Sequence, residues 1–344
     1  MAKPRMVDVA NRANVALATV SYALSGRRPV AAATRRRIMR AVEELGYAPN
    51  SLARGLASKR SNIVTLLLRN PERGIGFTEM EFVTGATQAA EALGYQLLLS
   101  LNDMSSLRQA EALAGSRLVD GAVIMEVHLD DERVSILEEA GIPFSMIGRP
   151  RDSAGRNCAD IDFDRTAHDA VQHLYELGHQ SIAFLNHSPS TLSSAYGPTV
   201  RAEQGFRAAA AEFGVRYKER LCGDGPDSGL LEFRDLLREA PDLTAVAVMN
   251  DRAAAGVLRA ITEIGAGVPE DYSIIAVASS ARVTEMFQPR LTTLEPPAAE
   301  LGGLAVRLLI ESLQAPPDDP REPVQALLPC RLVLGASLGP ARVA

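Results

Sequence analysis

Basic side chains, which could contact a polyanion, are concentrated near the N-terminus. Residues 1–60 hold twelve Lys and Arg against three Asp and Glu, whereas the remainder holds 24 basic and 39 acidic residues. The formal charge of −6 over 344 residues therefore conceals a cationic segment followed by an acidic body. This split indicates a polyanionic partner, but a solvated basic face would have the same charge. Only the order of the residues can distinguish these two interpretations.

Three short helices account for most of the basic segment. Apolar residues recur at helical spacing over residues 6–13, 16–24 and 32–45. Asn14 and Gly46 stand where a left-handed helix end is expected. Two short helices joined by a tight turn form a helix-turn-helix unit, and arginines follow the polar second helix. This pattern favours DNA binding over a plain three-helix bundle.

The same segment resembles the headpiece of the LacI/GalR repressor family. The match runs from about residue 6 to 60 and is carried by Val7-Asp8-Val9-Ala10, Ala13-Asn14-Val15, Thr19-Val20-Ser21, Leu24, Thr34-Arg35, Glu44-Leu45-Gly46-Tyr47 and Pro49-Asn50. The resemblance implies a helix-turn-helix headpiece at 1–49, a hinge helix and linker at 50–60, and an effector-binding and dimerisation core at 61–344. It also implies a repressor that binds a pseudo-palindromic operator as a homodimer, with affinity set by a small molecule.

The resemblance assigns base reading to the second helix. The family's base-reading positions are Leu17, Ala18 and Tyr22 here. Leu and Ala form no hydrogen bonds with base edges, so we expect contacts with thymine methyl groups and one hydroxyl from Tyr22. Phosphate contacts are expected from Thr19, Ser21, Arg27, Arg28, Thr34 and Arg35.

The segment after Pro49 resembles the family's hinge helix. It is too short to be a stable helix alone, and Gly55 weakens it further. The resemblance implies that two hinges pair in the minor groove, where Leu56 inserts between base pairs. The hinge contacts are expected from Asn50, Ala53, Arg54, Leu56 and Ala57.

From residue 62 onward, buried strands alternate with amphipathic helices. Apolar runs predict strands at 63–68, 95–101, 121–125, 143–147, 181–185, 244–249 and 273–277, with helices between them such as 79–93, 132–140, 163–177, 199–213 and 251–265. This alternation predicts parallel α/β sheets, and the length predicts two lobes. The resemblance is to the periplasmic sugar-binding fold, with lobe one at about 61–160 and 291–320 and lobe two at about 161–290 and 321–344.

An effector is expected at the carboxyl ends of the strands, between the lobes. The resemblance assigns Arg201 and Asn250 to hydrogen bonds with the effector, although Arg201 could be a surface ion pair and Asn250 a helix cap. Glu126, His128 and Arg149 are expected at the mouth of the cleft, as contacts or as rim.

The chain departs from the family pattern in the loop after residue 277. Relatives carry an Asp there that grips a sugar's vicinal hydroxyls, whereas this chain has Ala278, followed by Ser279 and Ser280 as the candidate contacts. A hydroxyl offers weaker, neutral hydrogen bonds than a carboxylate. We therefore expect the effector to be a sugar, a sugar acid or a related metabolite. It should be acidic or less hydroxylated than a typical sugar, or else sugar binding should be very weak.

Other function classes have little support. The five histidines lack metal-ligand spacing, no nucleophile elbow or P-loop occurs, and Gly74-Ile75-Gly76 is an incomplete dinucleotide motif, so no catalytic residue, metal or cofactor is expected. A secreted binding protein is the second alternative, opposed by the basic headpiece and by an N-terminus without an apolar signal region. Three scattered cysteines and the lack of a long apolar stretch predict a cytoplasmic protein without membrane contact. No leucine heptads end the chain, so dimers are expected.

Overall fold

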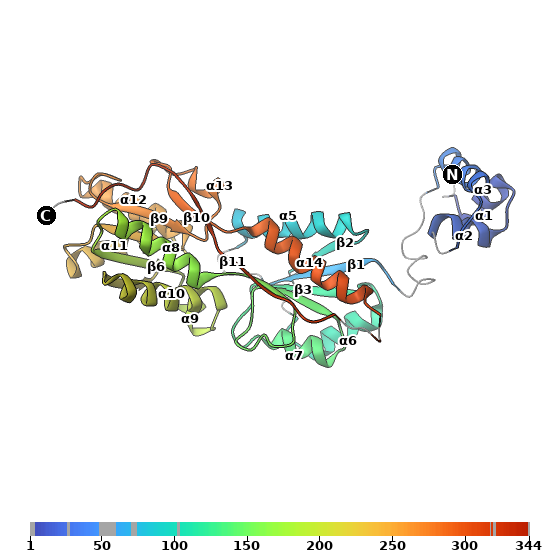
Figure 1. Ribbon diagram of the computed structural model, residues 1–344, viewed down its shortest axis with the longest axis horizontal. Coiled ribbons are helices and arrows are strands. Elements are labelled where there is room, and N and C mark those ends of the chain that lie inside the picture. The colour runs from blue at the N-terminus through green and yellow to red at the C-terminus, as the bar shows by residue number, and fades with distance from the viewer. Residues whose placement is uncertain are drawn as a thin grey trace. The chain divides into compact units, whose positions relative to one another are not determined.

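The computed structural model describes residues 4–25, 28–47, 60–69, 74–101, 104–316, 318 and 321–342. The chain divides into two compact units, Met1–Ser61 and Asn62–Ala344 (Figure 1). The first unit is the basic segment, which we call the headpiece, and the second is the acidic body. No described helix is long and apolar enough to cross a lipid bilayer.

The headpiece contains α1 (Met6–Ala13), α2 (Leu17–Ser25) and α3 (Ala32–Leu45). Asn14 ends α1 with a φ of 50° and Gly46 ends α3 with a φ of 59°, so both predicted left-handed helix ends are confirmed. Ala31 precedes α3 without a side-chain cap. The helices enclose a small apolar core of Val9, Ala10, Ala13, Val20, Ala23, Ile38, Ala41 and Tyr47.

The first lobe of the body is built on a six-stranded parallel sheet with the order β11-β5-β4-β3-β1-β2. Its strands are β1 (Ile63–Leu68), β2 (Gln96–Ser100), β3 (Gly121–Met125), β4 (Phe144–Ile147), β5 (Cys158–Ile161) and β11 (Gln325–Leu328). Its helices are α5 (Phe77–Ala92), α6 (Leu107–Ser116), α7 (Glu132–Glu139) and α14 (Ala298–Gln314).

The second lobe is built on a six-stranded sheet with the order β12-β10-β9-β8-β6-β7, parallel except for β12. Its strands are β6 (Ser181–Asn186), β7 (Arg216–Leu221), β8 (Ala245–Val248), β9 (Ser273–Val277), β10 (Thr292–Glu295) and β12 (Arg331–Val333). Its helices are α8 (Phe163–Glu176), α9 (Pro189–Ser193), α10 (Gly197–Phe213), α11 (Pro226–Glu239), α12 (Asp251–Glu263) and α13 (Ala281–Thr284).

The chain crosses between the sheets after β5, after β10 and after β11 (Figure 1). Two of the expected lobe boundaries are therefore corrected. The segment 291–295, expected in lobe one, contains β10 and pairs with β9 in the second sheet. The segment 325–328, expected in lobe two, is β11 and pairs with β5 in the first. Hydrogen bonding to a distant strand, and not the local sequence, decides to which sheet each segment belongs.

Helices α5 and α14 lie side by side against the first sheet (Figure 1). Their backbones approach closely where each helix has a glycine. A Cβ on Gly85 would lie 1.9 Å from the carbonyl oxygen of Ala299, and one on Gly302 would lie 2.1 Å from that of Phe82. A side chain at either position would separate the helices.

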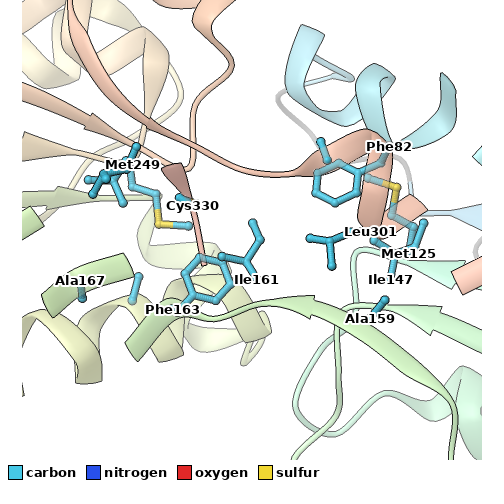
Figure 2. Close-up of a cluster of buried hydrophobic side chains, with 14 of the residues drawn as sticks. Phe82, Met125, Ile147, Ala159, Ile161, Phe163, Ala167, Met249, Leu301 and Cys330 are labelled. Carbon is cyan, nitrogen blue, oxygen red and sulfur yellow. The ribbon is translucent and has the colours of Figure 1, made fainter. Parts of the chain in front are cut away.

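The largest apolar cluster spans the crossing segments (Figure 2). Ile161 and Phe163 on the first crossing and Cys330 on the third lie between the two sheets, with Met249 on one side and Met125 on the other. All three cysteines are buried without a disulfide, and burial raises the pKa of the Cys158 thiol to about 11. They act here as small apolar side chains.

Candidate functional site

Helix α2 presents one face to the headpiece core and the other to solvent. Val20 and Ala23 are buried, as expected for the inner face. Leu17 is 49% exposed and Ala18 is also exposed, while Tyr22 is half-buried. The side chains expected to read bases thus include two that are accessible on the outer face of α2.

The side chains expected to contact phosphates surround this face. Arg28 and Arg35 are exposed, and Thr19, Ser21 and Thr34 are half-buried. The guanidinium carbon of Arg28 lies 5.2 Å from the centre of the Tyr22 ring, a cation–π distance that restrains both side chains. Arg27 and the hinge residues Asn50, Ala53, Arg54, Leu56 and Ala57 lie outside the described residues.

A cavity of about 160 Å³ lies between the lobes of the body. Its wall is built where strands of both sheets end: Glu126 follows β3, Gly148 follows β4, Asn250 follows β8 and Ala278 follows β9. This is the location expected for a ligand in parallel α/β sheets. The side chain of Phe82 on α5 and those of Met125, Ile147, Ile161, Phe163 and Met249 supply apolar surface, and all six residues are labelled in Figure 2.

Of the six effector contacts expected from the sequence, Glu126 and Asn250 line this cavity. The Asn250 side chain is already occupied. Its Oδ1 accepts from the backbone N–H groups of Arg252 and Ala253, which caps α12, and its Nδ2 donates to the carbonyls of Cys222 and Gly223. This arrangement agrees with the alternative that Asn250 is a helix cap.

Arg149 and Arg201 do not line the cavity. Both side chains turn toward Asp160, which does line it. Arg149 Nε lies 3.4 Å and Arg201 Nη1 lies 3.9 Å from Asp160 Oδ2, and Arg201 Nη2 donates to the carbonyl of Pro150. Burial raises the pKa of Asp160 to about 6, and the two guanidinium groups oppose that rise. Asp160 is not among the effector contacts expected from the sequence.

Ser279 and Ser280 are buried behind Ala278 and do not line the cavity either. The Ser280 hydroxyl donates to Glu81 Oε1 at 2.7 Å and accepts from the Arg282 N–H, which caps α13. The Ser280 N–H donates to Thr78 Oγ1. Because Thr78 and Glu81 belong to α5, Ser280 joins the two lobes instead of facing a ligand.

The opposite rim of the cleft is also joined, through the loop after β3. His128 Nδ1 lies 2.7 Å from the carbonyl oxygen of Ser194, and Leu129 N–H donates to the carbonyl of Ala195. Burial, followed by the charge of Arg69, lowers the pKa of His128. A neutral ring at pH 7 with a proton on Nδ1 therefore donates to Ser194. His128 is a contact between lobes.

A buried ion pair holds the loop that contains Glu126. Both the Arg133 and Asp131 side chains are 0% exposed. Arg133 donates to both carboxylate oxygens of Asp131, at 2.9 and 2.7 Å, and to the carbonyls of Met125 and Glu126. Burial alone would raise the pKa of Asp131, but the hydrogen bonds and charge of Arg133 lower it. The sequence does not predict this pair, and its only signal is the position of Asp131 as the cap of α7.

Two protein families match separate parts of the chain. Residues 5–50 match the family described as bacterial regulatory proteins, lacI family, and residues 171–338 match the periplasmic binding protein-like domain. Among curated proteins, the HTH-type transcriptional regulator CelR of Thermobifida fusca is 31% identical, with 97% of this chain and 98% of CelR covered. Catabolite control protein A of Priestia megaterium is also 31% identical, with 88% and 90% covered.

Solved structures of such regulators superpose on nearly the whole chain. The Lac repressor dimer bound to operator and the anti-inducer ONPF has a TM-score of 0.78 at 26% identity, covering 98% of this chain and 99% of that one. The CelR–cellobiose complex has a TM-score of 0.71 at 29% identity, covering 97% and 99%. The expected combination of a helix-turn-helix headpiece with a two-lobe α/β core is confirmed.

Proposed function

This chain is a transcriptional regulator of the LacI family, and from that premise we propose that it represses transcription as a homodimer on a pseudo-palindromic operator. A small-molecule effector in the cavity between the lobes sets its operator affinity. The relatives named above are regulators and not enzymes, and their full-length similarity favours a regulator over the catalytic and secreted-protein alternatives. Its place is the cytoplasm, where the bacterial chromosome lies.

The observation that carries this proposal is the exposed face of α2 on a cationic unit with its own core. Leu17 and Ala18 on that face can contact thymine methyl groups, and Tyr22 can offer one hydroxyl. Arg28, Arg35 and the nearby hydroxyl side chains can hold phosphates and fix the position of α2 in the major groove. Sequence selection then depends mainly on apolar contacts.

The direct test is selection of operators from random duplexes by the full chain, followed by titration at several salt concentrations. We expect enrichment of a two-fold-symmetric sequence. Arg35→Ala should weaken binding to all duplexes alike and reduce the salt slope by about 1, since one phosphate contact is lost. Leu17→Ala should instead relax preference at one base pair per half-site, at a cost of about 1 kcal/mol. No preference for any symmetric duplex would disprove the proposal.

The proposed hinge contact is tested separately. Leu56→Ala should lower operator affinity without altering the thermal unfolding of the body, because the substitution removes a side chain that inserts into the minor groove only on DNA. The measurement is operator titration together with calorimetry of the free protein. Operator binding at the strength of the unmodified chain would rule out the insertion.

The dimer is proposed to form through the open edge of the first sheet. Strand β2 is the edge strand, and Leu98 and Leu99 on it, with Leu101 just after it, are exposed to solvent. Phe77 and Met80 on the neighbouring α5 are exposed as well. Large apolar side chains along the open side of an edge strand favour association. The Lac repressor with which this chain superposes is described as a dimer on its operator.

Leu98→Glu should therefore convert the dimer to monomers and weaken operator binding, because a charge would be buried at the interface without a partner. Sedimentation velocity and operator titration measure the two effects. Leu231→Glu on α11 is the matched control, since that leucine is 56% exposed on the second lobe. If both variants sediment as dimers at the same concentration, the β2 edge is not the interface.

The effector is proposed to bind the cavity in contact with its apolar floor and its carboxylates. The solved CelR relative was described with cellobiose, which supports a small organic effector in this chain too. Ala278 lines the cavity and offers no side-chain hydrogen bond at the position where the family pattern has a carboxylate, so we expect different contacts with the effector. Operator titrations with and without the effector show whether it weakens or strengthens operator binding.

A further inference from the structure

Helix α3 carries three arginines to which the operator contacts proposed above assign no role. Arg36, Arg37 and Arg40 are exposed, and no ion pair joins any of them to another described residue. Arg12 on α1, by contrast, pairs with Glu44 at 2.5 Å. We call Arg36, Arg37 and Arg40 the arginine face of α3. Their charges are available to a polyanion.

The arginine face lies on the side of α3 that is turned away from the headpiece core. Ile38 and Ala41 are the buried residues of this helix, at 0% and 3% exposure. Each residue advances an α-helix by about 100°, so Arg36 and Arg40, two positions before and after Ile38, both lie about 160° from it. Arg37 lies about 60° to one side of Arg40. The whole face therefore points into solvent.

The outer face of α2, which is proposed to enter the operator, points in another direction. Both helices contribute to one core, α2 with Val20 and Ala23 and α3 with Ile38 and Ala41. Because the two helices pack on that core from different sides, their outer faces diverge. We therefore expect a duplex that holds α2 in its major groove to leave the arginine face uncovered.

The charges of α3 lower the stability of the helix. Arg36 and Arg40 are four residues apart, and like charges at this spacing destabilise a helix. The last turn holds Glu43 and Glu44 and no basic residue, which is unfavourable at the negative end of the helix dipole. Ala31 precedes the first turn and supplies no side-chain cap. A bound polyanion would relieve the repulsion between the arginines, whereas folding alone gives no reason for it.

We propose that the arginine face of α3 binds the phosphates of a second segment of duplex DNA while α2 occupies the operator. Arg36 and Arg40 start about 6 Å apart along the helix axis, and their long side chains can reach phosphates that follow one another every ~3.4 Å along a strand. Phosphate contacts carry no sequence information, so the second segment can have any sequence. In the proposed function each headpiece contacts one operator half-site, so this second segment is an additional partner.

Capture of a second duplex by DNA-bound protein tests the proposal. The full chain is bound to an immobilised duplex, the sequence that the selection described above enriches most, and unbound protein is washed away. A labelled random-sequence duplex of about 30 base pairs is then added at several salt concentrations. We expect capture that weakens with salt, with a slope of log affinity against log salt of about −2 to −3, because two or three phosphates are neutralised.

Double variants of the headpiece locate the contact. Arg36→Gln/Arg40→Gln should reduce capture about tenfold, while its affinity for the immobilised duplex changes less than about twofold. Its headpiece should unfold at the same or a higher temperature, because a repulsive pair is removed. Arg36→Lys/Arg40→Lys keeps both charges and should keep capture within about threefold. The matched control is Arg5→Gln/Arg12→Gln, which removes two charges that lie in ion pairs and should leave capture intact.

Several results would overturn the proposal. Unmodified protein that captures no second duplex would do so directly, and undiminished capture by Arg36→Gln/Arg40→Gln would mean that another surface holds the second duplex. Weaker binding of this variant to the immobilised duplex, with its headpiece folded, would place both arginines on the operator itself. Equal losses of capture in the control would show that only net charge matters.

An acidic protein is the alternative occupant of the arginine face. Capture of a labelled polyglutamate peptide, without capture of the random duplex, would assign the face to such a protein and exclude a second DNA segment. The proposed function stands or falls separately, because it depends on whether the selection enriches a symmetric operator.

Discussion

Replacing Arg133 by Ala is expected to lower the free energy of unfolding of the body by about 3–5 kcal/mol. The Asp131 carboxylate would remain buried without its main partner, and the carbonyls of Met125 and Glu126 would each lose a hydrogen bond. An unpaired buried charge is far more costly than the pair. Urea unfolding of the full chain, followed by circular dichroism, measures the loss.

The control for Arg133→Ala is Arg151→Ala in the same lobe. Arg151 pairs with Asp130, but both side chains are largely exposed, so the change should have little effect on the free energy of unfolding. Asp131→Ala should be as damaging as Arg133→Ala, and the double variant should lose less than the sum of the two. Similar small losses for Arg133→Ala and Arg151→Ala would show that burial of the pair is not what stabilises the loop.

The sequence predicts best those elements whose signal is local. The helices of the headpiece follow from apolar spacing and from Asn14 and Gly46 at their ends, and the buried strands β3, β6 and β9 follow from continuous apolar runs. Strand β7 carries Arg216, Lys218 and Arg220 in alternation at the edge of its sheet, so no apolar run marks it. The sheet to which β10 and β11 each belong depends on pairing with strands far away in the sequence.

The effector site is predicted less well than the fold, for a related reason. The sequence places Asn250 and Ser280 shortly after buried strands and Arg201 near the start of a helix, but it does not reveal competing partners within the protein. Asn250 is used by backbone groups, Ser280 by Glu81 and Arg201 by Pro150. A side chain is available to a ligand only if it is not already hydrogen-bonded within the protein. Its partners come from other segments of the chain.

Loss of the Ile38 side chain is expected to abolish operator binding while the body stays folded. Ile38 is 0% exposed in a core of eight residues, and removal of such a side chain costs about 2–5 kcal/mol. A unit this small has little stability in excess of that loss. Once unfolding is favourable, each further 1.4 kcal/mol lowers the apparent operator affinity about tenfold, because only the folded headpiece binds.

Met39→Ala is the matched control, since the adjacent Met39 is 48% exposed on the same helix and its truncation should change stability by no more than about 0.5 kcal/mol. Calorimetry should show the headpiece transition lost in Ile38→Ala, with the body transition unchanged in both variants. The body forms a separate compact unit with its own cores, so nothing in it depends on Ile38. A simultaneous loss of body stability in Ile38→Ala would mean that the two units fold as one, and control of DNA binding by the cleft would then need no hinge.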